Sequence, residues 1–274
     1  GPLMPTLPPP GLTVQSLQRR DTKLDWWAPR LRRLAATISP DIVLCMGRMA
    51  NSYGGALQKA LPAAAVISTL RTGKNLPWPF RRSLQLTRHT IANSRAARQF
   101  LLTEFDLPES KISVISNGLI FGPDDSAHQD DRVAFRREHG ASPEDIVLID
   151  VAMFRPEKNQ IALVDMAARL PADLPWRLWF AGDGPARETC EARVRELNLT
   201  DRVNFLGWTK DPRPIYRAGD IAVHASKRES LSNFLIEAQA HGIPVVAAAA
   251  RGVDETFIDG QSGRLIEPGD LDGF

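Results

Sequence analysis

The sequence predicts an α/β protein with two parallel-sheet domains, and two observations carry that prediction. Short apolar runs alternate with helical segments along nearly all of the 274 residues, which is the order expected of βαβ units. Runs such as Ile146–Ile149 and Val245–Ala248 are apolar without polar alternation, as in strands that helices cover on both faces. A chain of this length can bury a substantial core in one large domain or two ordinary ones.

The first part of the chain predicts strands at Leu12–Leu17, Asp41–Cys45, Ala65–Thr69, Thr90–Ala92 and Ile112–Ile115. It predicts helices at Trp26–Ile38, Ala50–Leu61 and Arg95–Phe105. Ser94 stands directly before the last helix, where its hydroxyl suits an N-cap. The prolines in Leu76–Pro79 predict a loop.

The second part repeats the alternation. Strands are predicted at Ile146–Val151, Arg177–Ala181, Val203–Leu206, Ile221–Ala225, Pro244–Ala249 and Gly263–Ile266. Helices are predicted at Gln160–Leu170, Ala186–Leu197, Pro212–Ala218 and Ser232–His241. The polar segment Phe121–Glu138 is interpreted as a connector with a short helix near its end. The expected domains are therefore residues 5–121 and 122–274.

Composition restricts the classes of function. The formal net charge is only +2, whereas a nucleic-acid protein usually has a large basic excess. Two distant cysteines, Cys45 and Cys190, fit neither a metal site nor a disulfide framework, which indicates a reducing, cytoplasmic setting. No apolar stretch is long enough to span a bilayer. Basic residues cluster locally, which suits either a solvated helix face or a surface for an anionic acceptor or a membrane; they are Arg19, Arg20, Arg30, Arg32, Arg33, Arg71, Lys74, Arg81, Arg82 and Arg88.

The loop after the predicted strand Ile221–Ala225 has the strongest functional pattern. Ser230 or Ser232 can cap the helix that follows, and the first turn of a helix offers backbone N–H groups to a diphosphate. Glu229 precedes this helix and Glu237 lies in its second turn. Eight helical positions correspond to about 12 Å of rise, more than the roughly 5–9.5 Å between paired glycosidase carboxylates. They are therefore interpreted as two separate acceptors for hydroxyl groups, or as ordinary first-turn glutamates that favour the helix dipole.

Three further loops follow strands. Arg155 and Lys158 precede a helix and could neutralise phosphate charge, or simply lie in solvent. The glycines of Ala181–Pro185 permit a tight turn before a helix. Trp208 ends a strand where a base could stack, although a tryptophan there is also a common packing residue.

Together these segments resemble the retaining GT-B glycosyltransferases of family 4, also called group 1. The resemblance rests on the order of the motifs. In chain order they read Ile91-Ala-Asn-Ser94, Val114-Ile-Ser-Asn-Gly118, Arg155-Pro-Glu-Lys-Asn159, Gly182-Asp-Gly-Pro185, Val203-Asn-Phe-Leu-Gly207, Glu229-Ser-Leu-Ser-Asn-Phe-Leu-Ile-Glu-Ala238, Gly242-Ile-Pro-Val-Val246 and Asp259-Gly-Gln-Ser-Gly263.

The resemblance implies two facing Rossmann-like domains and a UDP- or GDP-sugar donor whose sugar is transferred with retention to a glycan or lipid-linked acceptor. It implies that Glu237 holds the ribose, that Glu229 contacts the donor sugar as the catalytic residue, and that Lys158 binds phosphate. The backbone of Leu231, Ser232 and Asn233 would form the phosphate cradle. No metal and no protein general base are expected, because the leaving phosphate helps deprotonate the acceptor.

The sequence departs from the family pattern at three places. Met153 stands where the family often has an arginine, for which Arg155 is a substitute. Arg71 stands where the family often has a histidine and is the candidate on the acceptor side. The chain is expected to be truncated at both ends. Two alternatives therefore stay open, a nucleotide-sugar binding module without turnover and a GT-B sugar-nucleotide epimerase.

Overall fold

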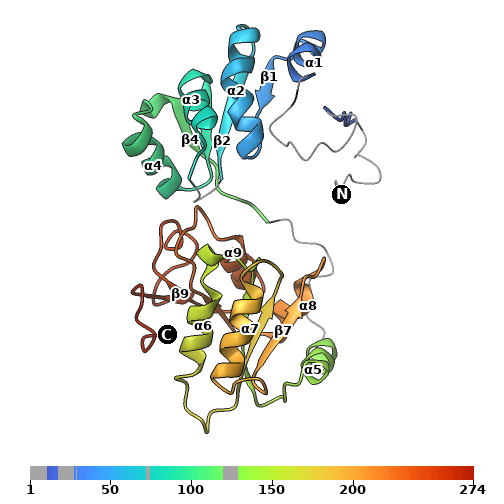
Figure 1. Ribbon diagram of the computed structural model, residues 1–274, viewed down its shortest axis with the longest axis vertical. Coiled ribbons are helices and arrows are strands. Elements are labelled where there is room, and N and C mark those ends of the chain that lie inside the picture. The colour runs from blue at the N-terminus through green and yellow to red at the C-terminus, as the bar shows by residue number, and fades with distance from the viewer. Residues whose placement is uncertain (1–10, 18–27, 29, 72–74, 120–128) are drawn as a thin grey trace. The chain divides into compact units, whose positions relative to one another are not determined.

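The computed structural model describes residues 11–17, 28, 30–71, 75–119 and 129–274. Contacts between Cα atoms divide the chain into two compact units, and the main division falls between Ile115 and Ser116. The expected domain boundary at 121/122 lies outside the described residues. Each unit is built around its own sheet (Figure 1).

The first unit contains a four-stranded parallel sheet in the order β1-β2-β3-β4. The strands are β1 (Ile42–Leu44), β2 (Ala65–Leu70), β3 (His89–Ala92) and β4 (Ile112–Val114). The helices are α1 (Leu31–Ile38), α2 (Arg48–Ala60), α3 (Trp78–Leu86), α4 (Arg95–Phe105) and the 3-10 turn η1 (Glu109–Lys111). The hydroxyl of Ser94 accepts a hydrogen bond from the N–H of Ala97 at 3.0 Å, which confirms the predicted cap.

Three predictions for this unit differ from the structure. Leu12–Leu17 forms no strand, because its alternating pattern has no neighbouring strand to pair with among the described residues. The helix predicted from Trp26 begins at Leu31, and residues 26 and 27 lie outside the described part of the chain. Leu76–Pro79 is not only a loop, since α3 begins at Trp78 with Pro79 in its first turn. Proline is tolerated there because the first turn needs no intrahelical N–H donor.

The second unit contains a six-stranded parallel sheet in the order β10-β9-β8-β5-β6-β7. The strands are β5 (Ile146–Val151), β6 (Trp176–Ala181), β7 (Val203–Gly207), β8 (Ile221–His224), β9 (Val245–Ala248) and β10 (Gly263–Ile266). The helices are α5 (Gln129–Glu138), α6 (Gln160–Ala167), α7 (Arg187–Glu196), α8 (Arg213–Ala218), α9 (Asn233–Ala240) and the 3-10 turn η2 (Pro156–Lys158). All six predicted strands and the short helix of the connector are confirmed.

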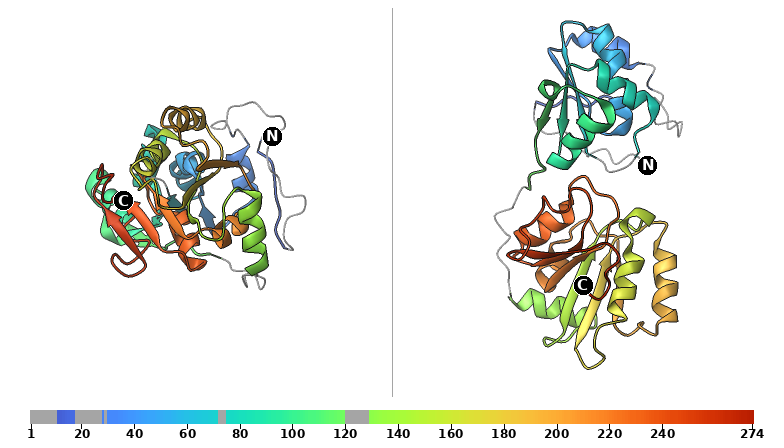
Figure 2. Two further views of the ribbon diagram at one scale, coloured as in Figure 1. Left: turned by 90° about the horizontal axis from the view of Figure 1, so that it is seen from below. Right: turned by 90° about the vertical axis from the view of Figure 1, so that its left-hand side faces the viewer.

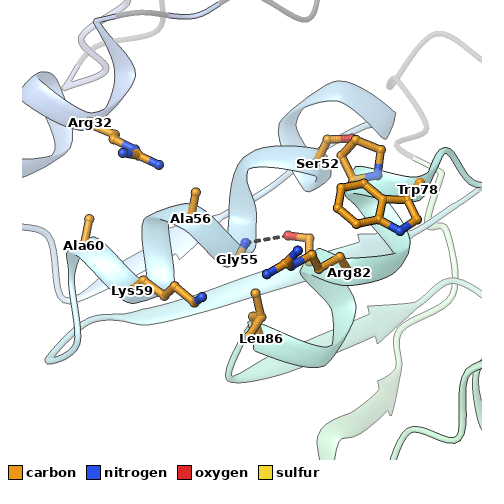
Figure 3. A pocket seen from close by; sticks show the side chains of 11 residues that line it. Arg32, Ser52, Gly55, Ala56, Lys59, Ala60, Trp78, Arg82 and Leu86 are labelled. Atoms are coloured by element: carbon orange, nitrogen blue, oxygen red, sulfur yellow. Dashed lines mark hydrogen bonds between the residues drawn. The ribbon is translucent and has the colours of Figure 1, made fainter.

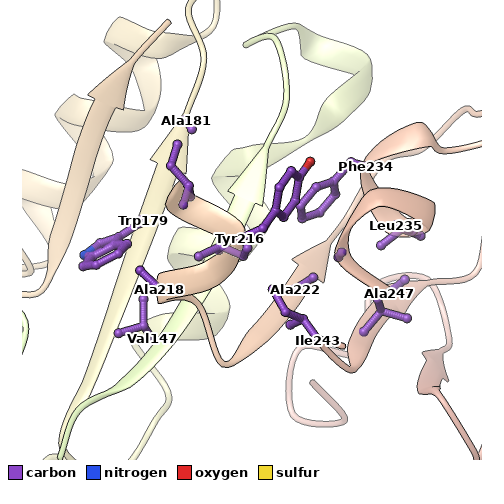
Figure 4. Close-up of a cluster of buried hydrophobic side chains, with 14 of the residues drawn as sticks. Val147, Trp179, Ala181, Tyr216, Ala218, Ala222, Phe234, Leu235, Ile243 and Ala247 are labelled. Carbon is purple, nitrogen blue, oxygen red and sulfur yellow. The ribbon is translucent and has the colours of Figure 1, made fainter. Parts of the chain in front are cut away.

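The six-stranded sheet is covered on both faces, as its apolar strands predicted. On β6, Trp179 packs into a cluster with α8 and α9, whereas Leu178 and Phe180 pack into the opposite cluster with α6 and α7. Figure 4 shows the first cluster, and Figure 2 shows the helices on the two sides of the sheet. Both clusters consist of side chains that are almost completely buried. This core fixes the strand ends from which the loops of the site project.

The order of the strands creates a switch point between β5 and β8. The chain leaves β5 toward β6 and β7, and then returns to the other side of β5 through β8, β9 and β10. In an open parallel sheet, a ligand-binding crevice is expected at such a switch point, beyond the carboxyl ends of the strands.

Candidate functional site

Lys158 and Glu229 meet at the switch point. Lys158 ends the turn η2 after β5, and Glu229 lies in the loop between β8 and α9. The ammonium Nζ of Lys158 lies 2.5 Å from Oε1 of Glu229, and the two side chains are 23% and 11% exposed. Residues 71 positions apart are thus brought together by the strand order rather than by their spacing in the sequence.

The backbone joins the same two loops. The carbonyl oxygen of Glu157 accepts a hydrogen bond from the N–H of Lys227 at 2.9 Å and another from the hydroxyl of Ser226 at 3.1 Å. Ser226 is buried, so these bonds are shielded from water. The loops after β5 and β8 therefore form one connected wall of the site.

Two glycines let neighbouring loops approach this wall. At Gly184, with φ +149°, an added Cβ would lie 2.2 Å from the carbonyl oxygen of Phe154. At Gly252, with φ +80°, it would lie 2.2 Å from the carbonyl oxygen of Ser230. Both positions need glycine for the positive φ and for the close contact. The Gly-Asp-Gly-Pro turn thus packs directly on the loop after β5, which is more than the strand–helix connection inferred from the sequence.

The start of α9 contains a buried hydroxyl. Ser232 occupies the N-cap position and is 2% exposed, but its hydroxyl caps no N–H and has no hydrogen-bond partner. The predicted side-chain cap is therefore wrong for Ser232. Ser230 and Leu231 are also buried, whereas Asn233 is exposed. A buried hydroxyl without a partner next to the first turn of a helix suits an anionic ligand.

A histidine and a second carboxylate lie beneath Glu229, and sequence reasoning missed both. Nε2 of His224 lies 3.1 Å from Oε1 of Glu229, and Nδ1 lies 3.5 Å from Oδ1 of Asp150. The side chains of Asp150 and His224 are 3% and 1% exposed. The signal was present, because each is a charged or titratable residue in an otherwise apolar strand.

These contacts set the protonation of the site. Burial acts to raise the pKa of Glu229, but the hydrogen bond to His224 and the charge of Lys158 outweigh it and lower the pKa to about 2. Burial acts to lower the pKa of His224, and the contacts with Asp150 and Glu229 outweigh it in turn, so that this pKa is raised. Glu229 is accordingly a carboxylate, and the imidazole of His224 favours its protonated form.

Glu237 has its own partner on α8. The hydroxyl of Tyr216 donates a hydrogen bond to Oε2 of Glu237 at 2.6 Å. Burial, followed by the charge of Glu237, raises the pKa of Tyr216, so that the phenol keeps its proton. Tyr216 was not predicted as a site residue. It orients Glu237 and uses one of its two carboxylate oxygens.

A pocket of about 260 Å³ lies at the ends of β5, β6 and β7. Its lining includes Met153, Asp183 and Trp208, and the Trp208 side chain is 71% exposed. Arg155 lies beside it, with Nε donating a hydrogen bond to the sulfur of Met153 at 2.8 Å. Trp208 is therefore no core residue, and it lines this pocket.

Arg71 belongs to the first unit. It directly follows β2, and it is exposed. Within the described part of the chain, no group of three His, Cys, Asp or Glu residues is arranged to hold a metal ion. Across the same residues, no helix has both the length and the apolar character that a membrane crossing requires.

Two profiles of known families match the chain. Residues 131–274 match the family described as "Glycosyl transferases group 1". Residues 6–120 match the family described as "Glycosyltransferase Family 4". The first match covers the second unit from Asp131 onward, and the second match covers most of the first unit.

Curated relatives match about half of the chain. The chain is 34% identical over 128 residues to the lipopolysaccharide core biosynthesis glycosyltransferase LpsE of Rhizobium meliloti, covering 47% of this chain and 37% of the relative. It is 32% identical over 151 residues to N-acetyl-alpha-D-glucosaminyl L-malate synthase of Bacillus anthracis, covering 53% of this chain and 40% of the relative. The chain thus spans well under half the length of these relatives.

Solved structures extend the likeness to both units. Anabaena Alr3699/HepE, in complex with UDP and glucose, matches with a TM-score of 0.79 and 23% identity over 94% of this chain and 72% of that chain. A glycosyltransferase from Rickettsia africae matches with a TM-score of 0.77 and 18% identity over 96% of this chain and 72% of that chain. This likeness shows the GT-B fold, as the sequence predicted. With this fold and the family match over more than half of its residues, the chain belongs to the group 1 glycosyl transferases.

Proposed function

We propose that the second unit binds a nucleotide-diphosphate sugar, UDP- or GDP-linked, and that the protein transfers the sugar with retention to a glycan or lipid-linked acceptor. The observation that carries this proposal is the convergence of Lys158, Glu229 and the start of α9 at the switch point between β5 and β8. A cation, a carboxylate and helix N–H groups in one crevice match the phosphates and hydroxyls of such a donor.

In this proposal, each part of the donor has its own place along the site, from the base to the sugar. The base occupies the pocket beside Trp208, and the ribose hydroxyls donate to Glu237, whose second oxygen is not used by Tyr216. The diphosphate contacts Lys158, Arg155 and the backbone of residues 231–233. The sugar then reaches Glu229, the proposed catalytic residue, with the buried Ser230 and Ser232 beside it.

Charge neutralisation at this site needs no metal ion in our proposal. Lys158 and Arg155 supply positive charge, and the N-terminus of α9 adds about half an elementary charge. The departing phosphate is stabilised by these groups and accepts the acceptor's proton. We further propose that Arg71 contacts the acceptor, because an exposed guanidinium after a parallel strand suits an anionic group.

Titration calorimetry with UDP, GDP, UDP-glucose and GDP-mannose tests the donor site, with and without EDTA. We expect binding of one nucleotide series in either buffer, and loss of sugar-nucleotide affinity in Glu229→Gln. Absence of binding by both series would overturn the donor site, and binding abolished by EDTA would overturn the metal-free proposal. Donor hydrolysis by the wild-type chain separates a transferase from a binding module, and recovery of an epimerised donor would favour the epimerase.

We also propose that the first unit contacts an anionic membrane surface, at the cytoplasmic face. A groove of about 560 Å³ lies between α2 and α3, and Arg32, Lys59 and Arg82 surround it (Figure 3). Trp78 is 66% exposed at the rim, with the Arg82 guanidinium 5.4 Å from its ring centroid. The helices α1, α2 and α3 contain no acidic residue. Clustered cations beside an exposed tryptophan suit an anionic lipid interface.

Sedimentation with phosphatidylcholine vesicles, with and without phosphatidylglycerol, tests this contact. We expect binding only to the anionic vesicles and its loss when Arg32, Lys59 and Arg82 are changed together to glutamine. The control changes three exposed cations of the second unit, Arg195→Gln, Lys210→Gln and Arg264→Gln. If both triple variants lost vesicle binding equally, net charge alone would explain the binding, and a specific membrane surface on the first unit would be contradicted.

A further inference from the structure

Asp150 and His224 form a buried pair that does not reach the crevice. Asp150 lies on β5 and His224 ends β8, the two strands that border the switch point. Both side chains are almost completely buried, at 3% and 1% exposure. Neither can touch a donor directly, so any role in the proposed reaction must act through Glu229.

Four side chains, which begin with Asp150 and end with Lys158, alternate in charge from the core to the crevice. Asp150 contacts His224, His224 contacts Glu229, and Glu229 contacts Lys158. Besides these charged groups, the ring of Phe234 on α9 packs against the imidazole at a centroid distance of 5.7 Å. A buried ionised group is stable only when opposite charge compensates it. The alternation provides that compensation with two carboxylates and two cations.

Lys158 and His224 contact the same carboxylate oxygen of Glu229. Nζ of Lys158 and Nε2 of His224 approach Oε1 of Glu229 at 2.5 Å and 3.1 Å. Neither contact uses the second oxygen, Oε2, which is the one left to accept from a ligand hydroxyl. The orientation of the carboxylate is thus set from one side.

Lys158 and His224 would respond differently to a bound diphosphate. Lys158 has a flexible side chain at the crevice, and its ammonium would turn toward the more highly charged diphosphate. His224 is enclosed by β5, β8 and α9 and has no room to follow. Once Lys158 contacts phosphate, His224 is the cation that remains with Glu229.

We propose that Asp150 and His224 are positioning residues that keep Glu229 ionised and its Oε2 directed at the donor sugar while Lys158 binds the diphosphate. This inference rests on the proposed function. The charge of Asp150, 3.5 Å from Nδ1, favours the protonated imidazole, whose Nε2–H lies toward Glu229. The raised pKa of His224 and the lowered pKa of Glu229 agree with this geometry.

The first test needs no ligand. The imidazole nitrogen shifts of the wild-type chain are followed by NMR, and the His224 signal is assigned by its loss in His224→Gln. We expect a doubly protonated ring at about pH 7.5, above the ordinary pKa of about 6.5, and a neutral ring in the isosteric variant Asp150→Asn. A neutral His224 in the wild-type protein would overturn the proposal, and this readout does not depend on the variants' activity.

The second test compares UDP with UDP-glucose, and GDP with GDP-mannose if the chain binds the guanine series. In His224→Gln we expect nucleotide affinity within about twofold of the wild type and sugar-nucleotide affinity about tenfold lower, the size of one lost charge-assisted hydrogen bond. The acid limb of sugar-nucleotide binding should also move to higher pH, because Glu229 loses a compensating charge.

His89→Gln serves as the control, because His89 lies on β3 in the first unit. An unchanged acid limb and unchanged sugar-nucleotide affinity in His224→Gln would overturn the proposal. Failure of the wild-type chain to bind either nucleotide series would instead overturn the proposed function. The two failures are therefore distinguishable. If His224→Gln does not fold, the imidazole signal that changes in Asp150→Asn assigns His224 instead, and its state in the wild-type chain still tests the proposal.

Discussion

Nζ of Lys158 lies 2.5 Å from Oε1 of Glu229, so that the residues proposed to bind phosphate and sugar form one ion pair. The pair is mostly desolvated, with exposures of 23% and 11%, and its contacts are therefore stronger than those of a surface pair. Donor binding at this site must rearrange the pair, which couples recognition of the diphosphate to recognition of the sugar. Variants at either position should consequently separate phosphate from nucleoside binding.

Replacing Lys158 with methionine should weaken UDP binding roughly ten- to hundredfold, the cost of a lost hydrogen bond to a charged group. Uridine binding should be unchanged, because the nucleoside does not reach this side chain. Calorimetry with UDP and uridine measures the two effects. Lys227→Met is the control, since Lys227 lies in the loop after β8 but is exposed. Equal losses for UDP and uridine would contradict a phosphate role for Lys158.

Glu237→Ala should lower the affinity for uridine and UDP by the same factor, about tenfold or more, because a ribose hydroxyl loses a charged acceptor. Tyr216→Phe should have a smaller effect in the same direction, because it releases Oε2 of Glu237 without removing the carboxylate. Competition between ribose and 2′-deoxyribose nucleotides measures the contact directly. A variant Glu237→Ala that still prefers the ribose form would refute it. Glu144→Ala is the control, because Glu144 is exposed in the turn before β5, at the opposite edge of the sheet.

The depressed pKa of Glu229 predicts a stability that depends on pH. Its folded-state pKa is about 2 against an ordinary 4.5. Such a group stabilises the folded protein above pH 4.5, and this stabilisation is lost as the pH falls from 4.5 toward 2. The full shift corresponds to roughly 3 kcal/mol. The free-energy gap between wild type and Glu229→Gln in urea unfolding should therefore shrink between about pH 6 and about pH 3. A gap that stays constant would contradict the ion pair.

The regular elements of the second unit follow directly from the sequence. Apolar runs of four to six residues form its strands within one or two residues of the prediction, because a fully covered parallel strand leaves little room for polar side chains. The first unit was predicted less well. Leu12–Leu17 has the composition of a strand without a partner, and Trp78–Leu86 forms a helix although two prolines flank its start.

The functional site was also only partly predictable from the sequence. Lys158 and Glu229 stand out in the sequence because they lie in loops after predicted strands, and Glu237 stands out because it lies in the helix that follows one of these loops. The sequence does not assign His224, Asp150 and Tyr216 to the site, because their partners depend on which strands and helices are neighbours. The contact between His224 and Asp150 needs β8 beside β5, an adjacency that the order of elements along the chain does not reveal. Strand order is a tertiary property, and so are the partners of the acidic residues.

Trp208 offers a direct optical test of the base pocket. Its side chain is 71% exposed beside a pocket of about 260 Å³, where a base would stack on the indole. Stacking of a base on an aromatic side chain contributes about 1–3 kcal/mol, so Trp208→Ala should weaken uridine binding about tenfold, whereas Trp208→Phe should retain most of the affinity. Tryptophan fluorescence should be quenched by UDP in the wild type and in Trp78→Ala, which removes an exposed tryptophan from the other unit. Quenching that persists in Trp208→Phe would place the base elsewhere.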